Sequence, residues 1–435
     1  MVSELDLDDT GLATCHARRL LALLGDATPV IAQADHPALA WRRSGLAAVT
    51  GRADGPALIS PVPLTSAATG ALQALAAIAP GAQLPTNGAV VLGERSRLLG
   101  LSRRGTTSPN GTCRLIETRD GRIALNLPRV DDWELMPALL SQDAPDWEGV
   151  ERAARGLATD DLVTQGRVLG LAIAADRDSA VPTAPFKLTP GITRSAASAG
   201  PLVVDLSALW AGPLAAALLR TCGARVIKIE SATRPDGARA GNPAFFDLLN
   251  TQKESVTLDF GDAADIEQLR LLVGRADIVI ESTRPRALRQ VGIHAEALAA
   301  TGKVWVSITG HGRDGDAAHW IGFGDDAAVA GGLSSAIARA WGEPLFAGDA
   351  VADPLTGITA ALAAWSFWRR GLGGLISIAL ADVIAHARGL GEAGSDLPTW
   401  AKLAARDTAP HYPLRSARSA ARSLGADTAS VLRAL

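Results

Sequence analysis

The sequence contains little cysteine, and its three cysteines lie far apart. Cys15, Cys113 and Cys222 are the only ones in 435 residues, and no two of them form a C-x-x-C pair. Thiols so few and so widely spaced exclude a disulfide framework and suggest no cysteine-based metal site. We therefore expect no bound metal, and a chemistry that depends on carboxylates, backbone amides and a bound substrate.

An excess of positive charge is also absent, as is a long uninterrupted hydrophobic run. The 42 Lys and Arg residues are balanced by 45 Asp and Glu, a net charge of −3, so the basic surface of a nucleic-acid reader is not expected. The charge-free stretch 55–93 is interrupted by prolines, and the apolar stretch 354–368 is shorter than the roughly 20 residues that cross a bilayer. The acidic start, MVSELDLDD, lacks the order of a secretory signal. We expect a cytoplasmic protein without nucleic-acid or membrane partners.

The second half of the chain alternates between strand and helix patterns. Short runs rich in Val and Ile occupy 202–205, 224–230, 255–259, 276–281 and 303–310, and 211–222 and 263–273 have helical spacing. Apolar strands separated by helices of about ten residues are typical of a parallel, doubly wound sheet buried on both faces. This half is predicted to be an α/β domain.

The first half is less regular and predicts a smaller unit. Residues 112–126 form two strand patterns joined at Asp120-Gly121, a hairpin signal, and helical patterns follow at 132–141 and 148–157. The stretch 186–200 contains Pro, Gly and small residues and is interpreted as a linker. The expected organisation is a large-domain-like segment (1–104), a small α+β domain (105–190), a linker (191–200), a large domain (201–395) and a tail with a closing helix (396–435).

An internal repeat connects the two ends of the chain. At an offset of 287 residues, 45–78 aligns with 332–365 without a gap, and 12 of the 34 pairs are identical. A weaker similarity pairs the region of Ala13 with that of Ala211 at an offset of 198. One difference concerns chemistry, because Ser66 in the first copy aligns with Asp353 in the second. We interpret residues 1–104 as a condensed first copy of the large domain.

Asp353 has two local interpretations. Followed by Pro354 and an apolar run, it is typical of a helix N-cap with proline at the first helical position. A carboxylate at a helix N-terminus is also held ionised by the helix dipole and the free amides. The ionised form is the one that attacks an acyl carbon. Local sequence does not separate the two.

Other candidate residues have similarly open interpretations. The turn DLSALWAGP (205–213) has one glycine where a dinucleotide fingerprint needs three, which disfavours nicotinamide and flavin cofactors. Trp210 in this turn either caps the core or faces a ligand. Lys228, Glu230 and Lys253 are exposed strand positions or, for the lysines, cations near a phosphorylated ligand. His311 and His319 are expected to be ordinary loop residues rather than metal ligands.

Several of these segments together resemble the family III CoA-transferases. They are VVDLSALWAGP, NTQKESVTLDF, ADIVIESTRPRALRQVGI, VSITGHGRDG, AVADPLTGI and the final LGADTASVLRAL, with nearly continuous similarity over 201–390. The resemblance implies a Rossmann-like large domain, a smaller α+β domain and an interlocked dimer. It also implies that CoA and acyl-CoA are substrates, with no permanently bound cofactor. The domain order departs from the family, because a small-domain-like segment at 110–140 precedes the large domain.

The resemblance assigns roles to particular residues. Asp353 aligns with the nucleophile that forms an aspartyl–acyl anhydride and then an aspartyl–CoA thioester, from which CoA passes to a carboxylic acid. Ser282-Thr283 replaces the usual Asn-Phe, and Gln290 replaces a frequent Arg. The family's CoA-contacting positions fall on Leu209, Trp210, Ala211, Leu258, Ser282, Thr283 and Gln290.

Two alternatives to a CoA-transferase stay open. An acyl-CoA racemase or isomerase of the same family has a catalytic histidine where this chain has Phe323, which argues against racemisation. A non-catalytic or partner-dependent subunit is compatible with the condensed first copy and the altered CoA contacts. The expected assembly is a homodimer, possibly with a related subunit. Ser66 is not expected to replace a carboxylate nucleophile.

Overall fold

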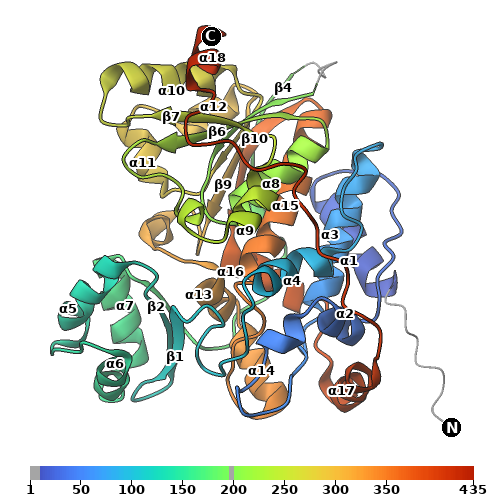
Figure 1. The fold of residues 1–435 in the computed structure, drawn as a ribbon, viewed down its shortest axis with the longest axis vertical. Helices are drawn as coiled ribbons and strands as arrows, with labels where there is room; N and C mark the ends of the chain where they lie inside the picture. Colours follow the sequence, from blue (N-terminus) through green and yellow to red (C-terminus); the bar gives the residue numbers. More distant parts are fainter. Residues whose placement is uncertain (1–9, 195–199) are drawn as a thin grey trace.

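The structure is a computed structural model that describes residues 10–194 and 200–435. The N-terminal MVSELDLDD segment and part of the expected linker, 195–199, lie outside the described residues. Figure 1 shows a large sheet with its helices, a small sheet set to one side, and the N-terminal helices packed on the opposite side. Among the described helices, none has both the length and the apolar character needed to cross a membrane.

The large sheet has seven strands in the order β4-β10-β9-β8-β5-β6-β7. Numbered from β5 onward along the chain, the six parallel strands have the order 3-2-1-4-5-6 of doubly wound Rossmann-type sheets. The predicted α/β fold class is therefore confirmed. The strands are β4 (Phe186–Thr193), β5 (Leu202–Leu206), β6 (Arg225–Ser231), β7 (Glu254–Leu258), β8 (Ile278–Glu281), β9 (Val304–Thr309) and β10 (Leu372–Ala379).

The interpretation of 186–200 as a linker is wrong for its first half. Strand β4 runs antiparallel to β10, with Thr189 opposite Leu375. It lies at the sheet edge, where Pro190 is tolerated because one side of the strand needs no ladder hydrogen bonds. At Gly191 a Cβ atom would lie 2.0 Å from the Ala299 carbonyl oxygen, so glycine here permits close packing on a neighbouring helix.

The small sheet forms a unit with its own core. Its order is β1-β2-β3, and β1 pairs with β2 antiparallel across the predicted Asp120-Gly121 turn. Helices pack on one face of this sheet around a separate hydrophobic cluster that includes Ile116, Met136 and Val150. The elements are β1 (Cys113–Glu117), β2 (Arg122–Asn126), β3 (Ala172–Ala175), the 3-10 helix η2 (Val130–Leu135), α5 (Met136–Leu140), α6 (Trp147–Ala154) and α7 (Thr159–Leu169).

Helices cover both faces of the large sheet. One face, around Val204 and Trp305, packs on α10, α12 and the closing helix α18. The other face packs on α8 and α15, which share one core with the N-terminal helices α1 and α3. The N-terminal segment therefore has no separate core. These helices are α1 (Thr10–Leu23), α3 (Leu64–Ile78), α8 (Ala211–Thr221), α10 (Ala263–Arg275), α12 (Ala295–Ala300), α15 (Ala352–Arg369) and α18 (Thr428–Arg433).

Shorter helices connect these layers and surround the carboxyl end of the sheet. They are α2 (Pro37–Arg43), α4 (Gly88–Leu98), α9 (Pro243–Asn250), α11 (Pro285–Gln290), α13 (Gly324–Ala330), α14 (Leu333–Trp341), α16 (Leu380–Arg388) and α17 (Leu397–Arg406), with the 3-10 helices η1 (Leu46–Val49), η3 (Gly237–Ala240), η4 (Gly315–His319) and η5 (Gly394–Asp396). Among them, α4 packs against α3 in the N-terminal segment, and α13 contacts both small-sheet strands β2 and β3.

The repeated sequence corresponds to a repeated helix packing. Helix α3 crosses α1 at Gly70, where a Cβ atom would lie 2.4 Å from the Ala13 carbonyl oxygen. Helix α15 crosses α8 at Gly357, where the same atom would lie 2.6 Å from the Ala211 carbonyl oxygen. The offset of 287 residues pairs Gly70 with Gly357, and the offset of 198 residues pairs Ala13 with Ala211. The two helix pairs then pack on each other through α3 and α15.

Candidate active site

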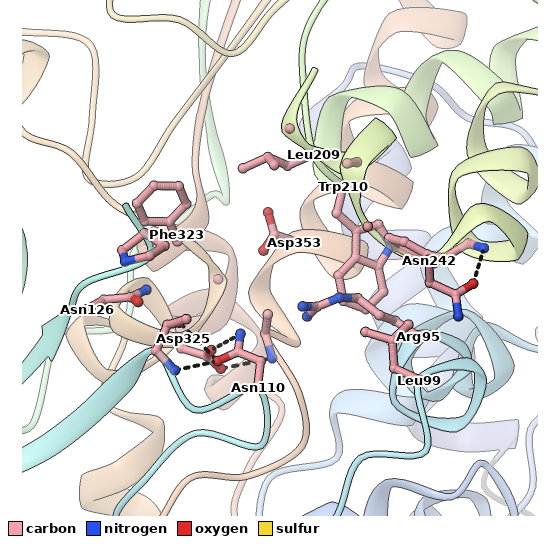
Figure 2. A pocket seen from close by; sticks show the side chains of 18 residues that line it. Arg95, Leu99, Asn110, Asn126, Leu209, Trp210, Asn242, Phe323, Asp325 and Asp353 are labelled. Carbon is pink, nitrogen blue, oxygen red and sulfur yellow. Dashed lines mark hydrogen bonds between the residues drawn. The ribbon is translucent and has the colours of Figure 1, made fainter. Parts of the chain in front are cut away.

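A cavity of about 300 Å³ opens where the small sheet, the large sheet and the N-terminal helices meet. It lies beyond the carboxyl end of β5, the position at which open α/β sheets bind ligands. Figure 2 shows its walls, with Phe323 and Asn126 on one side, Trp210 and Arg95 on the other, and Asp353 between them. Three segments far apart in the chain therefore contribute to one site.

Asp353 is the second residue of α15. The interpretation of Asp353 as the N-cap of this helix is therefore wrong. The helix begins at Ala352, with Val351 in the capping position. The helix therefore begins one residue before Asp353. Ala350, two residues before this start, takes a left-handed backbone conformation with φ of 45°. The Asp353 carboxylate faces the cavity and accepts a hydrogen bond from the Gly324 backbone N–H.

Burial raises the pKa of Asp353 to about 7. The positive charge of Arg95 acts in the opposite direction, whereas the negative charges of Asp326 and Asp349 raise the pKa further. The expectation that the helix N-terminus alone keeps this group ionised is therefore wrong, since loss of solvent outweighs the dipole and the amide. Near neutral pH the group exchanges readily between its acid and its nucleophilic form.

Gly324 allows the backbone to approach this carboxylate. A Cβ atom at this position would lie 2.2 Å from Asp353 Oδ2 and 2.7 Å from the Ala350 Cβ. Any other residue would displace Asp353 or the start of α13. The close approach of an amide donor to Asp353 thus depends on glycine.

Two further buried aspartates hold the walls of the cavity in place. Asp325 accepts hydrogen bonds from the Ala350 N–H (2.9 Å) and from Asn110 Nδ2 (3.2 Å). Asp326 accepts one from Asn126 Nδ2 (2.9 Å). Because Asn110 and Asn126 belong to the small-sheet unit, these bonds join that unit to the helix that carries Gly324. Burial raises the pKa of both Asp325 and Asp326 to about 7.

The sequence analysis did not identify Arg95, which is the one cation among the residues that line the cavity. It extends from α4, donates a hydrogen bond of 2.9 Å to Asp349 Oδ1 and lies 5.4 Å from the ring centre of Trp210. Arg95 is outside the segments that carry the family resemblance. No local motif distinguishes it from the other arginines of the chain.

The turn after β5 brings Leu209 and Trp210 to the cavity, as the resemblance implied for CoA-contacting residues. Leu209 is held at φ of 70° and donates its N–H to Asp236 Oδ1 at 3.0 Å. Trp210 is 3% exposed and packs edge-on against Phe245. Both interpretations of Trp210 therefore apply, because its ring is part of the hydrophobic core and also lines the cavity.

The remaining predicted CoA contacts do not line the cavity. Ala211 is buried in α8 and Leu258 at the end of β7, whereas Thr283 and Gln290 are exposed. Ser282 Oγ accepts a hydrogen bond from the Ala208 N–H at 3.1 Å and so supports the turn that carries Leu209. Leu258 and Ser282 stand at the carboxyl edge of the sheet, the same edge as the cavity. As CoA contacts, these positions stay predictions.

The interpretation of Lys228, Glu230 and Lys253 as exposed positions is wrong. All three are buried. Lys228 and Glu230 are on β6, which lies between β5 and β7 in a sheet covered on both faces, and Lys253 directly precedes β7. Lys228 pairs with Asp236 at 2.9 Å and Lys253 with Asp205 at 2.8 Å. These partners neutralise both lysines, so neither offers a free charge to a phosphate. The pairs instead fix the two ends of the turn that carries Leu209 and Trp210.

The predicted loop histidines are not gathered into a metal site. The side chain of His311 is 5% exposed and lies beside Trp320, with its Nε2 3.9 Å from Asp326 Oδ2. Throughout residues 10–194 and 200–435, no group of three or more His, Cys, Asp or Glu side chains is arranged to hold a metal ion.

Comparison with known proteins finds similarity to one family over part of this chain. Residues 199–390 match the model of CoA-transferase family III, which confirms the resemblance for that segment. The chain is 32% identical over 200 residues to a succinate–glutarate CoA-transferase of Agrobacterium fabrum, covering 42% of this chain and 50% of the relative. It is 30% identical over 166 residues to an acetyl-CoA:oxalate CoA-transferase of Acetobacter aceti, covering 36% and 43%.

Other matches are also partial. The alpha subunit of a succinyl-CoA–L-malate CoA-transferase of Chloroflexus aurantiacus is 32% identical over 142 residues, covering 30% of this chain and 33% of that subunit. Among solved structures, a CaiB/BaiF family protein of Brucella suis is 28% identical with a TM-score of 0.36, covering 50% and 60%. The alignments span about half or less of each curated relative named here. Asp353 lies inside the family segment and Arg95 outside it.

Proposed function

We propose that this protein is an acyl-CoA:carboxylate CoA-transferase in which Asp353 is the nucleophile. One observation carries the proposal: a half-buried carboxylate, whose pKa desolvation raises to about 7, faces a cavity at the carboxyl end of the parallel sheet, with an amide donor on it. The family segment and relatives named CoA-transferases support the same class of reaction. CoA and its thioesters are then substrates.

The first half-reaction exchanges two bonds on Asp353. A carboxylate oxygen attacks the thioester carbon of the acyl-CoA donor, the C–S bond breaks, and CoA leaves as its thiolate. The mixed anhydride that remains is attacked by this thiolate at the aspartyl carbon, which releases the donor as a free carboxylate and leaves an aspartyl–CoA thioester.

The second half-reaction is the reverse, with the acceptor acid in place of the donor. The acceptor carboxylate attacks the aspartyl carbon and CoA thiolate leaves; the thiolate then attacks the acceptor's acyl carbon and frees Asp353. Each attack at the aspartyl carbon puts negative charge on an oxygen of that group. The Gly324 N–H already donates to the Asp353 carboxylate, so it is positioned to stabilise these intermediates.

Mass spectrometry of trapped protein tests the proposal. The protein is incubated with acetyl-CoA and with succinyl-CoA, then treated with hydroxylamine, which converts an aspartyl thioester to a hydroxamate, or with borohydride, which reduces it to an alcohol. We expect the mass change in the peptide that contains Asp353 and its loss in Asp353→Asn. The matched control is Ser66→Ala, at the equivalent place of the repeat, which keeps the modification. An unmodified Asp353 with both donors, despite measurable CoA binding, would contradict the proposal.

The pH dependence of the first half-reaction gives a second test. Since only ionised Asp353 attacks, the single-turnover rate rises as pH increases through about 7 and then levels off. Asp326→Asn removes a negative charge that raises the pKa of Asp353, so the midpoint of this rise moves to lower pH. A midpoint unchanged by the substitution would contradict the assignment of the titrating group.

A partner-dependent subunit is the second candidate. It is favoured by the partial match to each curated relative, one of which is named an alpha subunit. This candidate requires a related subunit, whereas the proposed enzyme is expected to be a homodimer of this chain. Light scattering of the purified protein together with the trapping experiment separates the two candidates. A monomer in which Asp353 is modified would exclude this candidate.

A further inference from the structure

Arg95 both forms an ion pair within the fold, with Asp349, and lines the cavity in which a substrate would bind. It is the single cation lining a cavity whose wall also contains Asp325 and Asp353. Its guanidinium has five N–H donors, and Asp349 is the only group to which it donates a hydrogen bond within the described part of the chain. In Figure 2 its side chain extends into the cavity toward Asp353. Several donors therefore stay available on the cavity side.

The proposed reaction places two carboxylates in this cavity, one after the other. An incoming acid reacts as its anion, yet above about pH 7 Asp353 and Asp325 are themselves ionised and make the cavity negative. In a site screened from water, like charges repel strongly, so an anion enters only where a cation offsets them. Arg95 is the group that provides this offset.

We propose that Arg95 binds the carboxylate of the acceptor acid, and that esterification of Asp353 makes Arg95 available for it. In the free protein, Arg95 stabilises the Asp353 anion. In the aspartyl–CoA thioester that charge is gone, and a small carboxylate takes its place beside the guanidinium. The inference depends on the proposed function and goes beyond it by naming the residue that selects the acceptor.

The surroundings of Arg95 define the class of acid. Trp210, which lies under its guanidinium, and Phe245 form an apolar wall along the cavity, and the volume of about 300 Å³ is at the small end of ligand sites. A short-chain carboxylate with an uncharged or flexible chain fits these features. The N-terminal segment supplies this residue, although it lies outside the family segment.

Equilibrium binding to Asp353→Asn tests the proposal without any turnover. Asparagine has nearly the shape of aspartate and lacks its charge, so it imitates the esterified residue. Calorimetry at pH 8.5 measures binding of succinate and of its uncharged diamide. We expect succinate to bind Asp353→Asn about tenfold more tightly than the wild type. The diamide is expected to bind both proteins equally.

Removal of the cation identifies its role. In the Asp353→Asn background, Arg95→Gln is expected to weaken succinate binding about tenfold or more, and Arg95→Lys to weaken it less. The matched control is Arg97→Gln on the same helix, whose side chain donates to the Tyr412 carbonyl oxygen instead. If Arg95→Gln fails to fold because Asp349 loses its partner, Arg95→Gln with Asp349→Asn removes both charges together.

The outcomes separate this inference from the proposed function. Equal succinate affinity of wild type and Asp353→Asn, or no loss on removal of Arg95, would overturn the inference even if Asp353 forms an adduct. Tighter binding that requires Arg95 would support it as an acid-binding site even if no adduct forms. A loss of affinity with Arg97→Gln as large as with Arg95→Gln would also overturn it.

Discussion

The N-termini of α3 and α15 occupy equivalent places in the two halves of the repeat but differ in what surrounds them. Both helices cross a partner helix through a glycine, Gly70 in one and Gly357 in the other. Ser66 and Asp353 lie on their first turns; Ser66 is buried and Asp353 is half-buried, facing the cavity. Only the α15 end faces a cavity with an arginine, an amide donor and a tryptophan wall. The shared packing serves stability, whereas the chemistry depends on what the neighbouring segments add.

The largest expected effect is the loss of the nucleophile. Asp353→Asn is expected to lower CoA transfer by about a thousandfold or more, since it removes the group that forms both covalent intermediates. The thermal midpoint should change little, because asparagine keeps the volume of the side chain.

The equivalent serine provides the comparison. Ser66→Ala should transfer CoA at close to the wild-type rate. Ser66→Asp should not rescue Asp353→Asn, because Ser66 does not line the cavity that Asp353, Arg95 and Gly324 share. Transfer is measured by chromatography of the two CoA thioesters. Activity of the Ser66→Asp, Asp353→Asn protein would mean that the first copy retains a working site.

The amide donor on Asp353 gives the next largest effect. In Gly324→Ala the new Cβ would lie 2.2 Å from Asp353 Oδ2, so the carboxylate and the amide must separate. We expect the transfer rate to fall about a hundredfold, as for the loss of one donor to a developing oxyanion. Gly274→Ala is the matched control, because a Cβ there meets no atom within 4 Å. Equal rates for the two variants would show that this contact does not matter.

The two glycine crossings separate stability from activity. Gly70→Ala and Gly357→Ala each press a methyl group on a backbone carbonyl oxygen, at 2.4 and 2.6 Å. Both are expected to lower the free energy of unfolding by about 2 kcal/mol, as overpacking does. Only Gly357→Ala should also lower CoA transfer, since α15 carries Asp353. Denaturant titration and the transfer assay measure the two effects, and a loss of activity in Gly70→Ala of the same size would remove the distinction.

The sequence predicted those parts of the molecule whose physics is local. The parallel strands follow from runs of Val and Ile, and the β1–β2 hairpin follows from Asp120-Gly121. Strand β4 was missed because its glycine and proline are typical of loops, and only pairing with β10 makes it a strand. Composition cannot show such pairing.

The candidate site depends on contacts between segments that are far apart in the sequence, so the sequence alone predicted it only in part. Asp353 was identified through its family motif, but its raised pKa results from burial and from the charges of Asp326 and Asp349, against the opposing charge of Arg95, and these groups meet only in the folded chain. Arg95 contacts Asp349 across 254 residues, and no periodicity or motif predicts such a pair. Lys228 was misjudged for the same reason, since a buried lysine is acceptable only with a partner such as Asp236.

The smallest expected effect compares a buried histidine pair with a buried aspartate by the pH dependence of stability. His16 on α1 and His386 on α16 are buried with ring centres 5.5 Å apart, and burial lowers their pKa values to about 3 and about 4. The unfolded chain binds protons at these groups below about pH 6.5 and the folded chain does not, so these histidines make the fold less stable as pH falls. Asp326 near the cavity behaves oppositely. Its folded pKa of about 7 exceeds the unfolded value, so its contribution to stability is lost as pH rises from about 4 to 7.

Thermal melts of two variants at pH 5 and pH 8 separate these contributions. His16→Leu removes a group that is charged in the unfolded chain at pH 5, so its melting temperature relative to wild type should be higher at pH 5 than at pH 8. Asp326→Asn removes a group that resists ionisation in the fold, so its melting temperature relative to wild type should be higher at pH 8 than at pH 5. We expect differences of about one degree, as about 1 kcal/mol produces in a protein of 435 residues. Shifts of the same sign in both variants would mean that burial does not set the protonation of the two regions in opposite directions.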